Sequence, residues 1–546
     1  MREFVQSFFK KKYSYNSVAI VIALYYALVF NFPVLFRIKE ILGGLESYSL
    51  LFLISVPFFF FFVLSFLFNL LSWPYITKAV FIFLIVTSSV VLYGTVNYGV
   101  YFDSGMVENV AETNLIESTS YISFYSIAWI FLIGIIPSII LFKTKLTVGD
   151  RLIKFIFSKL LILSFSLIGV LIIAFFCYKD YSSVGRNNAY LVKMIIPTQY
   201  INSGFKYVNE NYLSRPGAYK EIGLDAYIKD KEKDVKPTLF VFMLGETARA
   251  ENFEVLGYSR PTNPFTKKYD LIPFKNVSSC GTATAVSVPC MFSQLQKDDY
   301  SKSRANSQDN LLDIMKRAGV SLLWLENDGG DKGVARNIEN IEVDHDVVDD
   351  QCNGSTCYDM ELLNELEKHI DKNMDGDQFA VLHLIGSHGP TYYQRYPKEM
   401  TFFQPVCDRS DIENCSSEQI VNTYDNTIRY TDYVLSETIK KLKSYEHRYN
   451  VALFFISDHG ESLGESGLYL HGTPYKFAPE QQTHVPMLAW FSEGFFEKKG
   501  IDMQCLRKKA ENGQFSQDNI FDSMLGIMDI QTEARDPKRD LFSTCR

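Results

Sequence analysis

Two patterns of apolar and polar residues divide the chain near residue 178. Before this point, long uncharged apolar runs follow one another with short polar breaks. Beyond it, short apolar runs alternate with mixed stretches, which is typical of a soluble globular domain. The sequence therefore predicts a transmembrane domain over 1–178, a linker with a surface-lying amphipathic helix over 179–215, and a soluble domain over 216–546.

Five of the apolar runs are long enough to cross a bilayer as helices, which takes about 20 residues. The first run follows three lysines and is similar to a signal peptide. No small-residue cleavage site follows it, however, so we expect it to remain in the protein. The predicted transmembrane helices cover residues 17–36, 48–72, 79–100, 121–142 and 157–178.

Basic residues predict the orientation of these helices. Lysine and arginine gather before the first run and between the fourth and fifth runs, whereas residues 101–120 contain acidic residues and neither lysine nor arginine. Basic loops usually remain on the cytoplasmic side, so both basic segments should be cytoplasmic. An odd number of crossings then places everything beyond residue 178 on the far side of the membrane.

The spacing of the cysteines agrees with this placement. Three pairs are close in the sequence, namely Cys280/Cys290, Cys352/Cys357 and Cys407/Cys415. In an oxidising compartment such pairs predict short-loop disulfides. Zinc-binding thiolates are the alternative, which the lack of a C-x-x-C spacing disfavours. Spacing alone does not decide whether Cys505 pairs with Cys545.

Short apolar runs predict the strands of the soluble domain. Continuous apolar runs separated by helical stretches are typical of a mostly parallel α/β sheet covered by helices. The runs are TLFVFMLGE, SLLWLEN, FAVLHLIGSHG, VALFFISDHGE and VPMLAWF. In such sheets ligands bind at the carboxyl ends of the strands. Four of the runs end in polar residues that chemistry can use, namely Glu246, Asn327, His388, and Asp458 with His459.

Glu246, Asp458 and His459 form a candidate metal site, because two carboxylates and an imidazole at one sheet edge suit zinc or a similar divalent ion. The nearby segment SSCGTATAVSVPC, residues 278–290, supplies hydroxyl groups. A helix that begins near Thr282–Thr284 would favour an anion at its N-terminus. A metal-bound threonine hydroxyl loses its proton more readily and becomes a nucleophile. Together these features point to phosphoryl or sulfuryl transfer.

Composition excludes several classes of protein. The chain has 546 residues, of which 47% are hydrophobic, and its net charge is −8 without a basic stripe. With the apolar runs, these values exclude a wholly cytosolic enzyme and a disordered scaffold. Nucleic acid is not an expected partner.

Seven motifs carry a family resemblance. They are GETAR, SCGTATAVSVPCMFS, NDGGDKGV, GSHGP, SDHGESLGE, YLHGTPY and the terminal CR. Through them the chain resembles the phosphoethanolamine transferases of Gram-negative inner membranes, which include lipid A phosphoethanolamine transferases and the mobile colistin-resistance enzymes. The resemblance covers nearly the whole chain. It implies five transmembrane helices followed by a periplasmic domain of the alkaline phosphatase/sulfatase superfamily.

The resemblance also implies roles for individual residues. The zinc ligands would be Glu246, Thr284, Asp458 and His459. Thr284 would also be the nucleophile. Three further residues would contact the phosphoethanolamine phosphate or hold a second zinc near the two histidines, namely Lys332, His388 and His471.

A polar stripe in the third interhelical loop matches family positions implicated in holding the donor headgroup. Asn109, Thr113 and Glu117 stand four residues apart, which places them on one face of a helix. The chain departs from the family at one other position, and one further histidine is expected to be structural. Many relatives have asparagine where this chain has Asp328, and a carboxylate is less favourable beside a phosphate. His383 is expected to be a core residue of its strand.

The implied reaction is transfer of phosphoethanolamine from phosphatidylethanolamine to lipid A or another lipopolysaccharide acceptor, through a zinc-activated threonine and a covalent intermediate. The resemblance implies a multi-pass inner-membrane protein with its catalytic domain in the periplasm, and we expect it to act as a monomer. Two alternatives remain open. One is a phosphoglycerol transferase of the lipoteichoic-acid synthase type, and the other is a membrane sensor with an inactive hydrolase-like domain.

Overall fold

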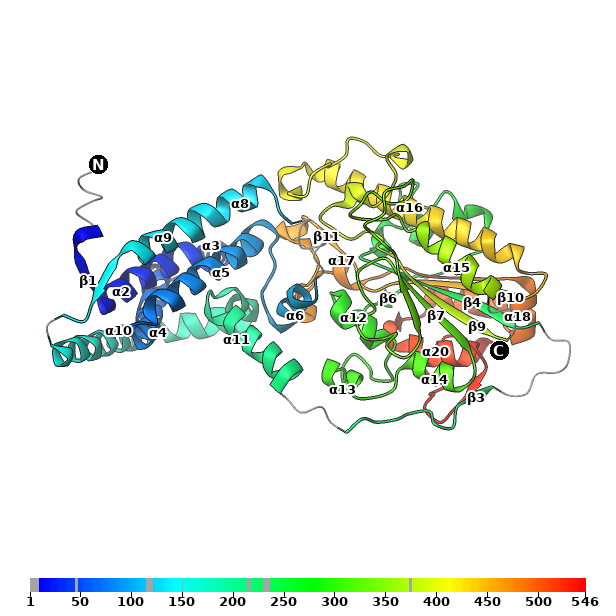
Figure 1. Ribbon diagram of the computed structural model, residues 1–546, viewed down its shortest axis with the longest axis horizontal. Helices are drawn as coiled ribbons and strands as arrows, with labels where there is room; N and C mark the ends of the chain where they lie inside the picture. Colours follow the sequence, from blue (N-terminus) through cyan, green and yellow to red (C-terminus); the bar gives the residue numbers. More distant parts are fainter. Residues whose placement is uncertain are drawn as a thin grey trace. The chain divides into compact units, whose positions relative to one another are not determined.

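The computed structural model describes residues 9–44, 48–113, 121–149, 151–213, 218–228, 236–372 and 376–546. Contacts within it divide the chain into two compact units (Figure 1). The first unit comprises Met1–Val107 and Ser123–Lys206, and the second comprises Glu108–Ile122 and Tyr207–Arg546. The division after Lys206 falls inside the linker expected over 179–215. Residues 108–122 belong to the second unit although apolar helices flank them in the sequence.

The first unit consists of apolar helices. Among the described residues, four helical segments are long and apolar enough to cross a membrane, namely α4 (Leu50–Leu71), α5 (Thr77–Asn97), Phe124–Lys143 and Leu152–Gly185, the last lying within α10 (Leu152–Asn187). A fifth span results if the bent pair Tyr15–Phe30 and Phe32–Gly43 counts as one. The unit therefore has four to five such helices, in agreement with the sequence pattern.

The bend in the first helical pair centres on Asn31. Its buried side-chain amide donates to the backbone oxygens of Tyr26 at 3.0 Å and Ile196 at 2.7 Å. The N–H of Ile196 donates back to the Asn31 side-chain oxygen at 3.1 Å. Pro33 lies in the first turn of the following helix and has no N–H to continue the hydrogen-bond ladder. The helical pair is consequently bent by 50° at this point.

A seven-stranded sheet forms the centre of the second unit (Figure 1). Its strands in spatial order are β5 (Ile272–Phe274), β13 (Met487–Phe491), β10 (Asn450–Ser457), β4 (Thr238–Gly245), β9 (Gln378–His383), β7 (Ser321–Glu326) and β8 (Glu339–Glu342). The strands from β10 to β8 are parallel, which confirms the mostly parallel α/β sheet. Strand β13 pairs antiparallel with both of its neighbours, which its apolar sequence did not indicate.

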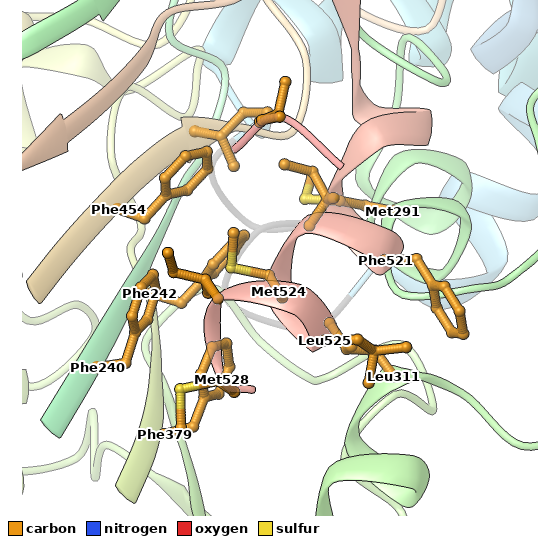
Figure 2. Packing of buried hydrophobic residues seen from close by; sticks show 14 of the residues in the cluster. Phe240, Phe242, Met291, Leu311, Phe379, Phe454, Phe521, Met524, Leu525 and Met528 are labelled. Carbon is orange, nitrogen blue, oxygen red and sulfur yellow. The ribbon is translucent and has the colours of Figure 1, made fainter. Parts of the chain in front are cut away.

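Helices cover both faces of this sheet, which explains why all eight residues of β4 and of β10 are buried. Helices α15 (Glu361–Lys372) and α16 (Ser417–Ser444) lie over one face, and α12 (Thr284–Met291), α14 (Leu311–Arg317) and α20 (Ile520–Ile527) lie over the other (Figure 1). Figure 2 shows phenylalanine side chains of β4, β9 and β10 beside Met524 of α20 and Met528, which directly follows this helix. The phenylalanines are Phe240, Phe242, Phe379 and Phe454. Burying each such side chain contributes about 1.5–3 kcal/mol.

Four disulfides lie in the second unit. They join Cys280 to Cys290, Cys352 to Cys357, Cys407 to Cys415 and Cys505 to Cys545. The last pair is one that sequence spacing left open. Cys177, which is buried in α10, is the one free cysteine among the residues that the structure describes.

These bonds predict the outcome of a thiol count. Protein denatured without reductant should expose one free thiol, that of Cys177. After reduction all nine cysteines should react. A Cys177→Ser variant should show no free thiol before reduction, which assigns the signal. More than one thiol in freshly purified protein would contradict the pairing.

Candidate active site

The parallel pairing of β4 with β10 brings two acidic residues together. Gly245 lies opposite Ser457 at the ends of these strands, so Glu246 and Asp458, the next residues of each, meet at one sheet edge. His459 follows, and its Nε2 lies 3.4 Å from Glu246 Oε1 and 3.2 Å from Asp458 Oδ2. All three side chains are fully buried. Their donor atoms lie within 4.8 Å of one another, as metal ligands do.

Thr284 points into the same cluster. Helix α12 begins at this residue, which confirms the expected helix start. The Thr284 hydroxyl lies 3.2 Å from Glu246 Oε2 and 3.4 Å from His459 Nε2. Residues in the first turn of a helix have N–H groups without an intrahelical acceptor. The hydroxyl that lies beside the carboxylates and the imidazole is therefore carried by the first turn of the helix.

A buried glutamine joins the two loops of this cluster. The side-chain oxygen of Gln517 accepts from the N–H of Cys280 at 2.7 Å. Its nitrogen donates to the carbonyl oxygens of Ser457 at 2.8 Å and Asp458 at 2.6 Å. Gln517 thus ties the loop before Thr284 to the end of β10. Sequence reasoning missed it, because glutamine carries no catalytic signal by itself.

The electrostatics of the cluster fit a metal ion. Burial, together with the Asp458 and Asp328 carboxylates, raises the pKa of Glu246 well above its ordinary value. Burial lowers the pKa of His459 to about 4, so its imidazole is neutral at pH 7. The buried Asp458 Oδ2 has no hydrogen-bond partner among the described residues. Two carboxylates beside a neutral imidazole are side chains that zinc accepts as ligands.

A second group of ligand-type atoms adjoins the first and shares Glu246. Donor atoms of Glu246, Asp328 and His388 lie within 4.8 Å of one another. Burial raises the pKa of Asp328 to about 6. Lys332, on the same loop, extends its Nζ to 3.4 Å from the Gly329 oxygen and lowers the pKa of both carboxyls through its charge. In sequence, the carboxylate of Asp328 is less favourable beside a phosphate than an asparagine, whereas the structure places Asp328 among candidate metal ligands.

His383 borders this second group. It is fully buried, as expected of a core residue, but its Nε2 faces the site at 4.0 Å from Glu246 Oε2 and 3.9 Å from Asp328 Oδ2. Its Nδ1 lies 2.8 Å from Glu326 Oε2. Burial alone would lower the pKa of His383, but the Glu326 carboxylate raises it to about 9. The expectation of a purely structural histidine is therefore incomplete.

The ring of His471 lies close to those of His459 and His388. Its ring centroid is 4.6 Å from that of His459 and 5.5 Å from that of His388. The carboxylate of Glu461, which is fully buried, lies 3.6 Å from His471 Nδ1. Sequence reasoning did not select Glu461, because a glutamate two residues after His459 has no distinguishing pattern.

The segment 108–113 of the second unit reaches His471. Asn109 Nδ2 lies 3.4 Å from His471 Nε2. The Thr113 hydroxyl donates to the Asn109 backbone oxygen at 2.7 Å, so this hydroxyl closes a helical turn. Glu117, the third member of the expected polar stripe, lies outside the described residues. The structure therefore brings Asn109 to His471 and leaves the headgroup-binding roles of all three residues as predictions.

Comparison with known proteins agrees with this arrangement. Residues 238–530, which include the sheet and every residue of the first cluster, match the sulfatase family model. Residues 60–212 match the model described as phosphoethanolamine transferase EptA/EptB. Fold and site thus define a sulfatase-type catalytic domain that follows a membrane domain of the phosphoethanolamine transferase kind.

Named relatives extend over nearly the whole chain. Phosphoethanolamine transferase EptA of Escherichia coli K12 is 36% identical and matches 98% of both chains. Phosphatidylethanolamine transferase Mcr-1 of Escherichia coli is 35% identical over 77% of this chain and 79% of its own. The integral membrane lipooligosaccharide phosphoethanolamine transferase A (EptA) from Neisseria meningitidis superposes with a TM-score of 0.95 at 35% identity, covering 98% of this chain and all of the other.

The chain therefore belongs to the phosphoethanolamine transferase family of the EptA and Mcr type. It is an enzyme of this activity and a multi-pass membrane protein with a soluble C-terminal domain.

From the raised pKa of the buried His383 we predict how the stability of the metal-free protein depends on pH. The pKa of His383 is about 9, above its ordinary 6.5. The stability contributed by its proton is thus fully present below pH 6.5 and is lost as the pH rises through about 9. Chelated protein should lose about 2 kcal/mol of stability between pH 7 and pH 9 from this group. Thermal unfolding at both values measures the change.

A His383→Gln variant is the control for that experiment, because it keeps a polar side chain and removes the titrating group. Its melting temperature should fall less between pH 7 and pH 9. An identical fall in both proteins would show that other groups cause the pH dependence.

Proposed function

We propose that the enzyme transfers phosphoethanolamine from phosphatidylethanolamine to lipid A or another lipopolysaccharide acceptor, through a threonine nucleophile and a covalent intermediate. The observation that carries this proposal is the position of the Thr284 hydroxyl, 3.2 Å from Glu246 and 3.4 Å from His459. A structural threonine at a helix start does not need buried metal-type ligands beside its hydroxyl. A nucleophile that must lose its proton does.

The first step is attack of Thr284 Oγ1 on the phosphorus of the donor. The new Thr284 oxygen–phosphorus bond replaces the phosphorus–oxygen bond to diacylglycerol. Diacylglycerol leaves with the proton that the threonine hydroxyl gives up. The product on the enzyme is a phosphothreonine that carries the ethanolamine group. The first turn of α12 and Lys332 face the charge of the phosphoryl oxygens.

The second step regenerates the threonine. An acceptor hydroxyl or phosphate oxygen attacks the phosphothreonine phosphorus, and the bond to Thr284 Oγ1 breaks. A histidine accepts the proton of an acceptor hydroxyl and returns a proton to the threonine oxygen. The candidates for this role are His388 and His471, whose ring centroids lie 5.5 Å apart.

The cofactor that fits the cluster is zinc, held by Glu246, Thr284, Asp458 and His459. A bound zinc ion would supply Lewis-acid stabilisation and lower the pKa of the hydroxyl. The residues support this assignment in two ways. His459 offers a neutral imidazole, and its Nδ1 lies 2.9 Å from the Gly460 backbone oxygen, which orients Nε2 toward the carboxylates. Asp458 offers an oxygen, Oδ2, that has no hydrogen-bond partner in the described part of the chain.

The donor headgroup is proposed to bind along Asn109, Thr113 and Glu117, with the Glu117 carboxylate paired to the ethanolamine ammonium. The contact between Asn109 and His471 supports this site, because it brings the start of the stripe to the pocket. The family assignment favours this donor over phosphatidylglycerol, the donor of the alternative phosphoglycerol transferase.

We place the catalytic domain in the periplasm of a Gram-negative inner membrane. The four disulfides of the second unit support an oxidising compartment. The distribution of basic residues around the apolar helices supports the same orientation.

Replacement of the nucleophile gives the sharpest test. Thr284→Ala should abolish formation of a phosphoethanolamine adduct on the enzyme and transfer to lipopolysaccharide, because no hydroxyl remains. Thr284→Ser should retain some of both. Intact-protein mass spectrometry with labelled phosphatidylethanolamine detects the adduct. Thr282→Ala is a matched control in the same loop, because the Thr282 hydroxyl donates to the Thr473 backbone at 2.6 Å outside the cluster. Modified lipid A from the Thr284→Ala enzyme would rule out the covalent route.

Charge removal tests the donor site. Glu117→Gln keeps the side-chain shape and removes its charge, so it should raise the KM for phosphatidylethanolamine and leave metal content unchanged. Labelled phosphatidylglycerol, supplied in parallel, should not be consumed. Full activity of the variant at limiting donor would remove Glu117 from the headgroup site. Mass spectrometry of lipid A and core fragments identifies the acceptor.

A further inference from the structure

The first unit contains an apolar groove with a volume of about 410 Å³. We propose that this groove binds one acyl chain of an anionic phospholipid, and that lysines at one end of the groove bind the lipid phosphate. The ligand is a component of the surrounding bilayer and is distinct from the zwitterionic donor of the proposed reaction. The inference concerns binding by the membrane domain and goes beyond the proposed function.

Two helices form the walls of the groove. In α2 (Tyr15–Tyr25), the lining residues Ser17, Val21 and Tyr25 recur at every fourth position and so share one face of the helix. The lining residues of α9 (Ile136–Lys143) likewise stand three or four positions apart. The groove therefore runs along both helices and follows α2 for two turns, about 12 Å.

Exposure distinguishes the floor of the groove from its rim. Ile22, Ile85 and Leu141 line the groove and are each at most 6% exposed. Val21 and Ile140 also line it but are 66% and 43% exposed. Packed side chains thus close the groove on its inner side, and its outer side is open at the surface of the unit. For helices that cross a membrane, this surface adjoins the hydrocarbon of the bilayer.

Two hydroxyl groups of the lining residues already donate within the protein. The Tyr25 hydroxyl donates to the Ile133 backbone oxygen at 2.7 Å. The Thr144 hydroxyl donates to the Ile140 backbone oxygen at 2.7 Å. Both donors are therefore satisfied without a ligand. An acyl chain, which forms no hydrogen bonds, suits a groove of this kind, whereas a polar ligand would lose its own hydrogen bonds there.

A short two-stranded sheet places a pair of lysines at one end of the groove. Strand β1 (Lys12–Ser14) pairs in parallel with β2 (Lys145–Thr147), and Lys12 lies directly opposite Lys145. Both lysines are exposed. Each is followed or preceded in the chain by a residue that lines the groove, Tyr13 and Thr144 respectively. The two charges therefore adjoin the apolar walls.

The charge at this end of the groove calls for an anion. Like charges directly opposite each other on paired strands destabilise the pairing. Residues 9–16 and 142–149, which surround the two strands, contain five lysines and neither aspartate nor glutamate. Lys11 adds to the positive charge, because its Nζ lies 5.7 Å from the ring centre of Tyr13. A phosphate between these ammonium groups would replace repulsion by attraction, as in other basic sites beside transmembrane helices.

The dimensions of the groove favour an acyl chain over a helix of a partner protein. A volume of about 410 Å³ over a length of about 12 Å corresponds to a mean cross-section of about 34 Å². A helix with a diameter of 10–12 Å needs roughly twice this area or more. A phospholipid also has its phosphate at the end of its apolar chains, which is the order in which the lysines and the apolar walls follow one another.

The experiment measures lipid binding by the full-length protein in detergent. Delipidated protein is titrated with dioleoylphosphatidylglycerol and, in parallel, with dioleoylphosphatidylcholine, which has the same acyl chains and no net charge. Native mass spectrometry counts the bound lipid. The wild type should bind phosphatidylglycerol at least about tenfold more tightly, because the lysines attract its net charge. Equal affinities for the two lipids would overturn the proposal.

A phosphatidylglycerol with a photoreactive diazirine in its acyl chain locates the bound lipid. Crosslinked peptides should contain Val21 or Ile140, which form the rim of the groove. Crosslinks confined to the second unit would place the lipid at the candidate active site and overturn the proposal.

Combining Lys12→Gln with Lys145→Gln tests the contacts to the phosphate. Each lysine near an anionic lipid contributes roughly fivefold, so the double variant should bind phosphatidylglycerol about 25-fold more weakly. Its affinity for phosphatidylcholine should not change. The matched control combines Lys39→Gln with Lys179→Gln, since both of these lysines are exposed and neither lines the groove. The control should bind phosphatidylglycerol as the wild type does.

Val21→Trp tests the groove itself, because a large side chain on its exposed rim would occupy the space of the acyl chain. This variant should lose the crosslink at Ile140. Leu24→Trp is the matched control, since Leu24 is 47% exposed on the same helix and does not line the groove. Wild-type affinity for phosphatidylglycerol in both the double lysine variant and Val21→Trp would overturn the proposal. Binding is measured without an acceptor, so these outcomes are independent of the proposed function.

Discussion

The parallel register of β4, β10, β9 and β7 is the constraint on which the site depends. Parallel strands end at the same sheet edge, so the residues that follow Gly245 and Ser457 meet there, as do Glu326 and His383 one strand further. If either register shifted by one residue, a candidate ligand would point into the apolar core. An apolar side chain would take its place beside the cluster. Packing against α15 and α16 on one face and against α12, α14 and α20 on the other holds this register, because both faces of β4 and β10 are buried.

The same geometry creates an electrostatic cost. Glu246, Asp328 and Asp458 are brought together in buried positions, where their mutual repulsion raises the pKa of Glu246 beyond the effect of burial. Such an arrangement is unfavourable for a structural core and useful for binding cations and phosphoryl groups. The repulsion between these carboxylates destabilises the folded protein at the candidate active site. The burial of apolar side chains elsewhere in the domain offsets this cost.

Segments remote in sequence complete the pocket. Asn109 comes from a segment between two apolar helices, yet it lies within 3.4 Å of His471 in the second unit. Gln517, near the C-terminus, ties the loop before Thr284 to the end of β10. The site is thus assembled from residues more than 400 positions apart in number, and a truncated chain would lack part of it.

The sequence by itself determined the apolar helices, the mostly parallel sheet and the first cluster, because hydrophobic period and strand-end polarity are local properties of the chain. It also indicated the start of α12 at Thr284. Tertiary structure alone decided the rest. The antiparallel direction of β13, the pairing of Cys505 with Cys545, and the positions of Asp328 and His383 depend on which strands and loops become neighbours. His383 looks like any buried strand residue in sequence, and only the adjacent strand shows that Glu326 turns its Nε2 toward the pocket.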